Sequence, residues 1–146
     1  MNPAHEHVTF NILLAEDDFD DRFFFAKALK EIPIATNLTT VHDGDQLMAY
    51  LFQHRKNLPD LLFLDLSMPL KTGFECLTEI KENIKLKNIP VVMFSTSFTS
   101  GIVFEDNLIN MLYKIGAQDY IRKPGDFAQL KQVIHHALIK AVEKLA

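Results

Sequence analysis

Short, uninterrupted hydrophobic runs alternate along the chain with stretches in which hydrophobic residues recur at helical spacing. The clearest run is Leu61-Leu62-Phe63-Leu64, which shows no polar alternation. Such a run is typical of a strand buried on both faces, as in a parallel sheet covered by helices. We therefore predict five strands, at Phe10 to Ala15, Leu38 to Val41, Leu61 to Asp65, Pro90 to Phe94 and Asp119 to Arg122.

Five helices are predicted in the remaining stretches, because apolar residues there recur every three or four positions. In the first helix Phe24 falls within the buried stripe and Phe23 beside it, and in the third Ile84 lies on the inner face. The predicted helices cover Asp18 to Glu31, the stretch from the turn-like residues 42–45 onward to about His54 (the turn itself excluded), Gly73 through Ile84, Phe104 to Lys114 and Phe127 to about Lys144.

This alternation predicts an α/β fold, a doubly wound (βα)5 sandwich in which one five-stranded parallel sheet lies between two layers of helices. A chain of 146 residues has room for one such domain and can bury a core without disulfides. We expect residues 1–8 to form a flexible N-terminal lead-in and residues 9–146 to form a single domain.

Composition narrows the class of protein further. The net charge of −4 gives no general attraction to nucleic acids or to anionic lipids, so we expect neither as a partner. The single Cys76 excludes an internal disulfide and suits a reducing compartment. Met1 to Thr9 show no basic segment leading into a long apolar core, as a signal peptide would, and no later run approaches the ~18 apolar residues that a membrane span needs. We therefore expect a cytoplasmic location and no membrane association.

Polar side chains follow four of the predicted strands at their carboxyl ends: Glu16 and Asp17, then Asp65, then Ser95, then Lys123. The carboxyl ends of parallel strands meet at one edge of the sheet, where ligands bind in open α/β folds. Three carboxylates gathered there would repel one another unless a cation lies among them. Mg²⁺ fits oxygen ligands of this kind, whereas no Cys or His joins the cluster to hold zinc.

Taken together, these motifs resemble the receiver domain of two-component response regulators, over residues from about 10 to 144. The resemblance rests on the acidic pair, the Leu64-Asp65-Leu66-Ser67-Met68-Pro69 segment, the Ser95-Thr96 strand end and Lys123-Pro124. It implies the flavodoxin-like form of the (βα)5 fold. It also implies a site in which Asp65 is the phosphoacceptor, Glu16, Asp17, Asp65 and the backbone carbonyl of Ser67 hold Mg²⁺, Ser95 and Lys123 contact the phosphoryl group, and Ser95 and Tyr120 form the switch.

The function implied by the resemblance is that of a stand-alone receiver in phosphorelay signal transduction. It would take a phosphoryl group from a histidine kinase or a histidine phosphotransfer protein, form an aspartyl phosphate, and bind partners according to its phosphorylation. It would not be an enzyme beyond its own phosphorylation and dephosphorylation. A homodimer through the helix at 104–114, the strand at 119–122 and the last helix is possible, and a cis peptide is expected between Lys123 and Pro124.

One feature departs from the family pattern and two other functions stay open. Lys123 follows Ser95 by 28 residues, so the loop from Phe98 to Val103 looks extended.

An aspartate-nucleophile phosphatase or phosphotransferase is the main alternative, although such enzymes usually carry a second Asp where this chain has Ser67. A flavodoxin-like nucleotide binder would need a glycine-rich phosphate loop, which does not follow the first strand here. Asp18 is expected to be a helix N-cap.

Overall fold

The computed structural model describes residues 9–96 and 102–145. The expected lead-in at 1–8 and residues 97–101 of the expected extended loop lie outside these ranges. Within them the chain forms five strands and five helices in strict alternation. In chain order these are β1 (Phe10–Ala15), α2 (Phe19–Glu31), β2 (Thr36–Val41), α3 (Gly44–Gln53), β3 (Leu61–Leu64), α4 (Gly73–Glu82), β4 (Val91–Ser95), α5 (Ile102–Ile115), β5 (Asp119–Arg122) and α6 (Phe127–Leu145).

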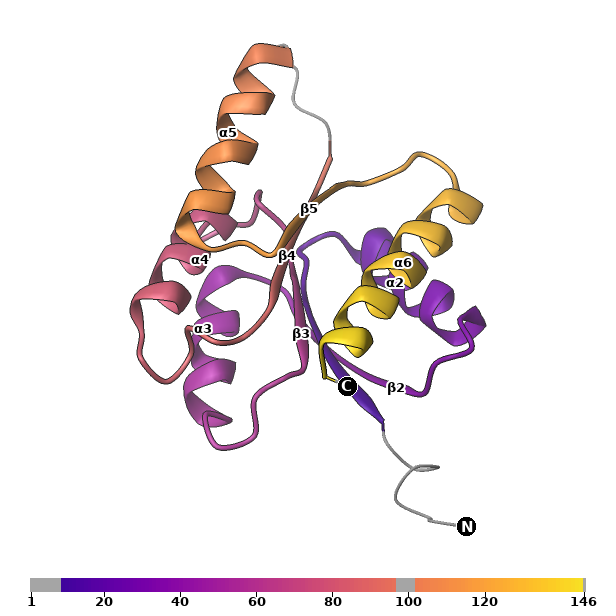
Figure 1. Cartoon of the computed structure of the whole chain (residues 1–146), viewed down its shortest axis with the longest axis horizontal. Helices are drawn as coiled ribbons and strands as arrows, with labels where there is room; N and C mark the ends of the chain where they lie inside the picture. Colours follow the sequence, from indigo (N-terminus) through magenta and orange to yellow (C-terminus); the bar gives the residue numbers. More distant parts are fainter. Residues whose placement is uncertain (1–8, 97–101, 146) are drawn as a thin grey trace.

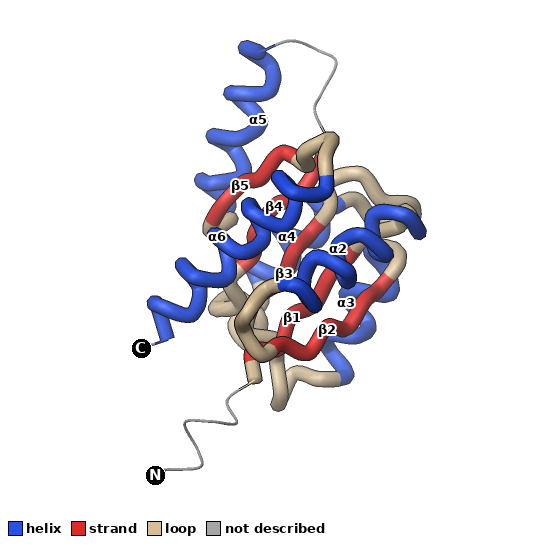
Figure 2. The backbone as a smooth tube through the Cα atoms, turned by 90° about the vertical axis from the view of Figure 1, so that its right-hand side faces the viewer, coloured by secondary structure: helices blue, strands red, loops and turns tan. Residues whose placement is uncertain are grey.

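The strands form one parallel sheet in the order β2-β1-β3-β4-β5. Figures 1 and 2 show α2 and α6 on one face of this sheet and α3, α4 and α5 on the other. The predicted doubly wound α/β fold is therefore confirmed. Among the described helices, none is long and apolar enough to cross a membrane.

The central strand β3 contributes to two hydrophobic cores, one on each face of the sheet. All four of its residues are fully buried, as the unbroken apolar run predicted. Leu62 and Leu64 pack towards α3, α4 and α5, and Leu61 and Phe63 pack towards α2 and α6. The ring of Phe63 meets that of Phe25 edge to face at 4.9 Å, which locks α2 onto the sheet.

Side-chain caps define where the helices next to the predicted site begin. Asp18 accepts a hydrogen bond from the backbone N–H of Asp21 at 2.8 Å, so its expected role as the N-cap of α2 is confirmed. Thr72 and Glu75 form a reciprocal capping box at the start of α4. These caps fix the first turns of both helices against the carboxyl edge of the sheet.

The predicted burial of two helix residues is wrong. Phe24 is 43% exposed, because Phe25, Ala28 and Leu29 carry the buried stripe of α2 and Phe24 lies at its border. Ile84 is 79% exposed, because α4 ends at Glu82 and the chain becomes extended at the C-cap, so helical spacing no longer applies there.

Several predicted boundaries also shift by one or two residues. β2 begins two residues before its predicted start, β3 ends just before Asp65, and β4 runs one residue further, to Ser95. α5 begins at Ile102, so residues 102 and 103 belong to a helix and not to the expected loop. Helix and strand ends depend on capping and pairing, which hydrophobic spacing does not report.

Candidate active site

Strand pairing brings three of the predicted site segments to one edge of the sheet. Ala15 pairs with Leu64, and the backbone N–H of Asp65 donates to the carbonyl of Ala15 at 3.1 Å. At the other side of the sheet, the N–H of Lys123 donates to the carbonyl of Ser95 at 2.7 Å. The side chains that follow β1 and β3 therefore start from neighbouring strands, and Lys123 starts from the same edge, with β4 between β3 and β5.

Glu16, Asp17 and Asp65 form a compact group of carboxylates. One oxygen from each lies within 4.8 Å of the others. Glu16 and Asp65 are buried, whereas Asp17 is exposed. The backbone N–H of Ser67 donates to Asp65 Oδ1 at 3.1 Å and orients that carboxylate. The predicted clustering of the three acids is thus present in the structure.

The cation that these buried acids require is supplied by Lys123. Its ammonium contacts Glu16, lies 3.0 Å from Asp21 Oδ2 and lies 3.3 Å from Asp65 Oδ2. The Lys123 side chain is only 9% exposed. An unpaired buried charge is costly. The shared Lys123 ammonium therefore allows Glu16 and Asp65 to be buried side by side at the carboxyl edge of the sheet.

Asp21 was not among the predicted site residues. With Asp18 as the N-cap, Asp21 occupies the third position of α2, from which a side chain points back towards the helix N-terminus. That N-terminus lies at the edge of the sheet where Lys123 emerges. The N-cap assignment was the one sequence signal that could have brought Asp21 into the site.

The electrostatics of the site follow from crowding and burial. Burial, together with a hydrogen bond and repulsion from Asp65, raises the pKa of Glu16 to about 8 despite the opposing effect of Lys123. Burial alone would lower the pKa of Lys123, but its hydrogen bond to Glu16 and the charges of Asp65 and Glu16 raise it. Lys123 is therefore protonated at neutral pH, and its one positive charge is shared among the carboxyl groups of Glu16, Asp21 and Asp65.

The other predicted site residues lie around this group without all contacting it. Ser95 is buried at the end of β4 and is aligned with Arg122 on β5. Ser67 is exposed, and its contact with Asp65 uses its N–H, so the metal-ligand role of its carbonyl stays a prediction. Tyr120 is half-buried and its hydroxyl donates to Glu105 Oε2 of α5 at 3.3 Å, away from the acids.

The expected cis peptide between Lys123 and Pro124 is wrong, since the described residues contain no cis peptide bond. A trans bond before proline is favoured by about 0.5–1 kcal/mol unless the surroundings require the cis form. Here the trans chain already delivers the Lys123 ammonium to Asp65 and its neighbours.

Gly73, at the start of α4, makes room for the backbone of Asp65. A Cβ atom at Gly73 would lie 2.0 Å from the carbonyl oxygen of Asp65 and 2.8 Å from Cα of Leu66. The N–H of Gly73 also donates to the carbonyl of Leu66 at 2.9 Å. Hydrophobic patterning identified Gly73 only as the start of a helix, but its lack of a side chain is what lets the segment after β3 close against α4.

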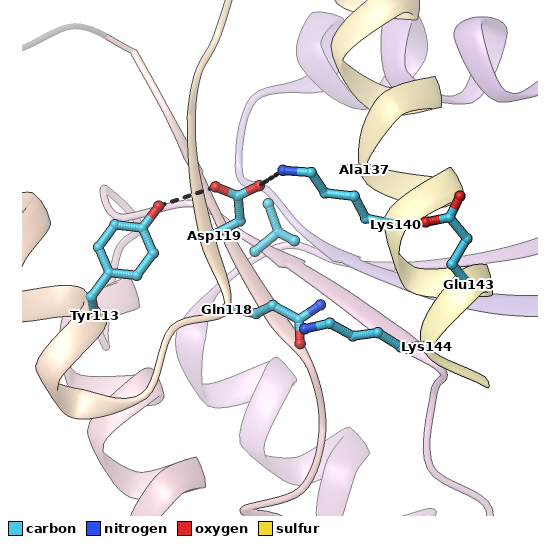
Figure 3. A pocket seen from close by; sticks show the side chains of 8 residues that line it. Tyr113, Gln118, Asp119, Ala137, Lys140, Glu143 and Lys144 are labelled. Atoms are coloured by element: carbon cyan, nitrogen blue, oxygen red, sulfur yellow. Dashed lines mark hydrogen bonds and ion pairs between the residues drawn. The ribbon is translucent and has the colours of Figure 1, made fainter. Parts of the chain in front are cut away.

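Two hollows flank β5, one at each end. A hollow of about 280 Å³ beside Lys123 is lined mainly by apolar and aromatic side chains, including Phe24, Phe94 and Phe127. A hollow of about 490 Å³ lies at the start of β5, where Tyr113 and Lys140 both point at Asp119 (Figure 3). The second hollow is at the opposite end of the strand from the acidic group, so it is no part of the candidate active site.

The family model of the response regulator receiver domain matches residues 12–135. This chain belongs to the response regulator receiver domain family. It is therefore a receiver domain of two-component signalling, as the sequence motifs indicated, and its family is one of signalling regulators. The aspartate-nucleophile phosphatase and the nucleotide-binding alternatives find no support in this comparison.

Relatives of known structure share the fold and are 32–36% identical to this chain in sequence. The response regulator Rcp1 of Synechocystis sp. is 35% identical over 127 residues, which are 84% of this chain and 82% of Rcp1. The crystal structure of the phosphorylated cyanobacterial phytochrome response regulator RcpA matches with a TM-score of 0.76 and 36% identity, covering 89% of this chain and 91% of RcpA. The Mn²⁺-bound form of Rcp1 matches with a TM-score of 0.74 and 32% identity, covering 87% and 90%.

The acidic group suits the divalent cation that receiver domains bind in their acidic pocket. Glu16, Asp17 and Asp65 offer oxygen ligands only, and Asp17 is exposed enough to leave one side of the site open to water. Mg²⁺ prefers such sites, because it binds a few carboxylates and keeps several of its waters. The residues present therefore fit the expected Mg²⁺.

We predict that Asp17→Ala binds Mg²⁺ at least about tenfold more weakly than the unmodified chain, since a hard cation held by few carboxylates depends on each of them. Titration calorimetry measures this affinity directly. Asp20→Ala, which removes an exposed acid of α2 outside the group, is the matched control. Equal affinities in the two variants would place the metal elsewhere.

Proposed function

We propose that this receiver accepts a phosphoryl group on Asp65 from a histidine kinase or a histidine phosphotransfer protein, and that its phosphorylation controls which partner it binds. The observation that carries the proposal is the surroundings of Asp65. Its side chain is 8% exposed, and its carboxylate lies 3.3 Å from the ammonium of Lys123 and belongs to the group that fits Mg²⁺. We further propose that the protein acts in the cytoplasm, with neither a nucleic acid nor a membrane as a partner.

Each residue has a chemical role in this proposal. An oxygen of Asp65 attacks the phosphorus in line with the leaving group, and the Ser67 N–H keeps the carboxylate oriented. Negative charge on the transferring oxygens is stabilised by Lys123, and the hydroxyl of Ser95 donates to one of them. Mg²⁺, held by Glu16, Asp17, Asp65 and the carbonyl of Ser67, supplies further charge neutralisation when bound.

Incubation with Mg²⁺ and a small phosphodonor tests this function against the enzymatic alternative. A receiver gains at most one acid-labile phosphoryl group per chain, and it uses further donor only as fast as that aspartyl phosphate hydrolyses. An aspartate-nucleophile phosphatase turns the donor over many times, which requires a second acid or base beside the nucleophile. Ser67 stands where such enzymes usually have that residue. Turnover of the donor much faster than hydrolysis of the phosphorylated chain would contradict the receiver function.

We propose that the signal leaves through α5, β5 and α6. Tyr120 and Arg122 of β5 both contact the buried carboxylate of Glu105 on α5. Burial, and then the charge of Glu105, raises the pKa of Tyr120 to about 12, so its hydroxyl stays a donor. If phosphorylation draws Ser95 towards the phosphoryl group, the adjacent strand β5 is the first element that can respond, and Tyr120 with it.

The same surface is the proposed site of a twofold dimer. β5 is an edge strand, and the helices beside it expose several large apolar side chains, namely Met111, Tyr113, Ile139 and Val142. Exposed apolar residues beside a strand edge are typical of an interaction surface, and twofold pairs are the commonest homo-oligomers. Dimerisation or partner binding here would explain how a receiver transmits its state.

Amide hydrogen exchange with and without beryllofluoride, a phosphoryl mimic, tests the output surface. We expect protection to change from Glu105 to Arg122 as well as around Asp65, because Tyr120 and Arg122 link β5 to α5. Residues 36–53, which form β2 and α3 at the far edge of the sheet, serve as the internal control. A change confined to the surroundings of Asp65 and Lys123 would show that the phosphoryl group passes onward without an output surface.

A further inference from the structure

The ammonium of Lys123 has a full set of carboxylate partners before a phosphoryl group arrives. An ammonium carries three N–H donors, and here three carboxylates accept from it. Glu16 and Asp65 belong to the acidic group that fits Mg²⁺, whereas Asp21 comes from α2 and is not a member of that group. Contact between Lys123 and a phosphoryl oxygen therefore requires that one existing contact be given up.

Asp21 is the partner whose contact can be broken most easily. Its side chain is 40% exposed, compared with 2% for Glu16 and 8% for Asp65. Water can solvate a partly exposed carboxylate when its ion pair opens, whereas a buried carboxylate has no such replacement. The structure therefore distinguishes one exchangeable partner from two that remain in place.

We propose that Asp21 is a positioning residue that competes with the phosphoryl group for Lys123. In the resting protein the Asp21 carboxylate occupies the third N–H of the ammonium. When a phosphoryl group is attached to Asp65, that N–H turns to a phosphoryl oxygen and Asp21 is released to water. The inference rests on the proposed function, and it means that Asp21 lowers the population of the phosphorylated form at a given supply of phosphodonor.

Beryllofluoride binding at saturating Mg²⁺ measures this competition without covalent chemistry. Asp21→Asn keeps the size of the side chain and removes its charge. Asp20→Asn removes the same charge from the preceding residue of the same helical turn, and the exposed Asp20 side chain forms no hydrogen bond or ion pair with the part of the chain that the structure describes. Comparing the two variants separates the contact with Lys123 from the general loss of negative charge.

We expect Asp21→Asn to bind beryllofluoride about three- to fivefold more tightly than Asp20→Asn, the range of a partly exposed ion pair. Asp21→Ala, which removes the acceptor entirely, should act in the same direction. In urea unfolding without beryllofluoride, Asp21→Asn should be less stable than Asp20→Asn, because both lose an acid that favours the helix N-terminus but only Asp21 loses an ion pair. A purely structural role would change the stability without tightening the binding.

Equal beryllofluoride affinities in the two variants would overturn the inference. Weaker binding by Asp21→Asn would also overturn it, because Asp21 would then support Lys123 in the phosphoryl-bound form and not compete for it. A failure of the unmodified chain to bind beryllofluoride at all would contradict the proposed function instead. Failure of the competition by Asp21 and failure of the proposed function therefore give different results.

Discussion

Asp65→Asn is expected to abolish phosphorylation by a small phosphodonor while leaving the protein folded. The amide keeps the volume of the carboxylate, and its oxygen can still accept the hydrogen bond from the Ser67 N–H. It cannot act as the attacking nucleophile. Intact-mass measurement after incubation with Mg²⁺ and phosphodonor should show one added phosphoryl group on the unmodified chain and none on the variant.

Asp60→Asn is the matched control for this experiment. Asp60 lies immediately before β3, at the opposite end of the strand from Asp65, and its carboxylate accepts from the backbone N–H of Asn11 at 2.8 Å. It should be phosphorylated like the unmodified chain. Asp65→Asn should unfold at the same or a higher temperature, because it removes one of two mutually repelling buried acids. An equal mass gain in Asp65→Asn and Asp60→Asn would refute the assignment of the phosphoacceptor.

Gly73→Ala is expected to destabilise the fold by about 3 kcal/mol, the upper part of the range for overpacking a tight site. The new Cβ would meet the backbone of Asp65 and Leu66, and backbone atoms cannot turn aside as a flexible side chain can. This cost exceeds the ~0.5–1 kcal/mol that alanine normally gains over glycine in a helix. Urea unfolding measures the difference, and the phosphorylation rate should fall as well, because Asp65 is displaced.

Gly125→Ala provides the comparison for this substitution. Gly125 follows Pro124 in the segment between β5 and α6, and nothing lies within 4 Å of the position that its Cβ would occupy. We expect its unfolding free energy to stay within ~0.5 kcal/mol of that of the unmodified chain, as for most open surface positions. If Gly73→Ala were as stable as Gly125→Ala, the close approach of α4 to Asp65 would not be a constraint on this fold.

Much of the fold could be predicted because the burial of the sheet is visible in the sequence. A strand covered on both faces needs apolar residues at every position, and β3 meets that requirement with four residues that are all fully buried. Parallel strands joined by helices end at the same edge, so the position of a polar residue after each strand predicts its neighbours there. This is why the amino-acid sequence was enough to group Glu16, Asp17 and Asp65.

The burial of individual helix residues could not be predicted, because it depends on where each helix ends and on which of its faces packs against the sheet. Ile84 continued the helical spacing of α4 in the sequence, but the helix stops at Glu82 and the residue points into solvent. Phe24 and Phe25 are the same residue type and stand next to each other in α2. Only Phe25 faces the sheet and is buried. A hydrophobic pattern states which residues prefer burial, not which of them the packing of neighbouring elements can accommodate.

By itself, the sequence determined the order of the elements, the edge of the sheet at which the chemistry lies, and the residue types that meet there. It could do so because these properties follow from local periodicity and from the fixed direction of parallel strands. Only the tertiary structure decided how Lys123 divides its ammonium among Glu16, Asp21 and Asp65, and that Gly73 must lack a side chain. Both features depend on distances of a few ångströms between segments far apart in the chain, which are set by the packing of α2, α4 and β5 against the sheet.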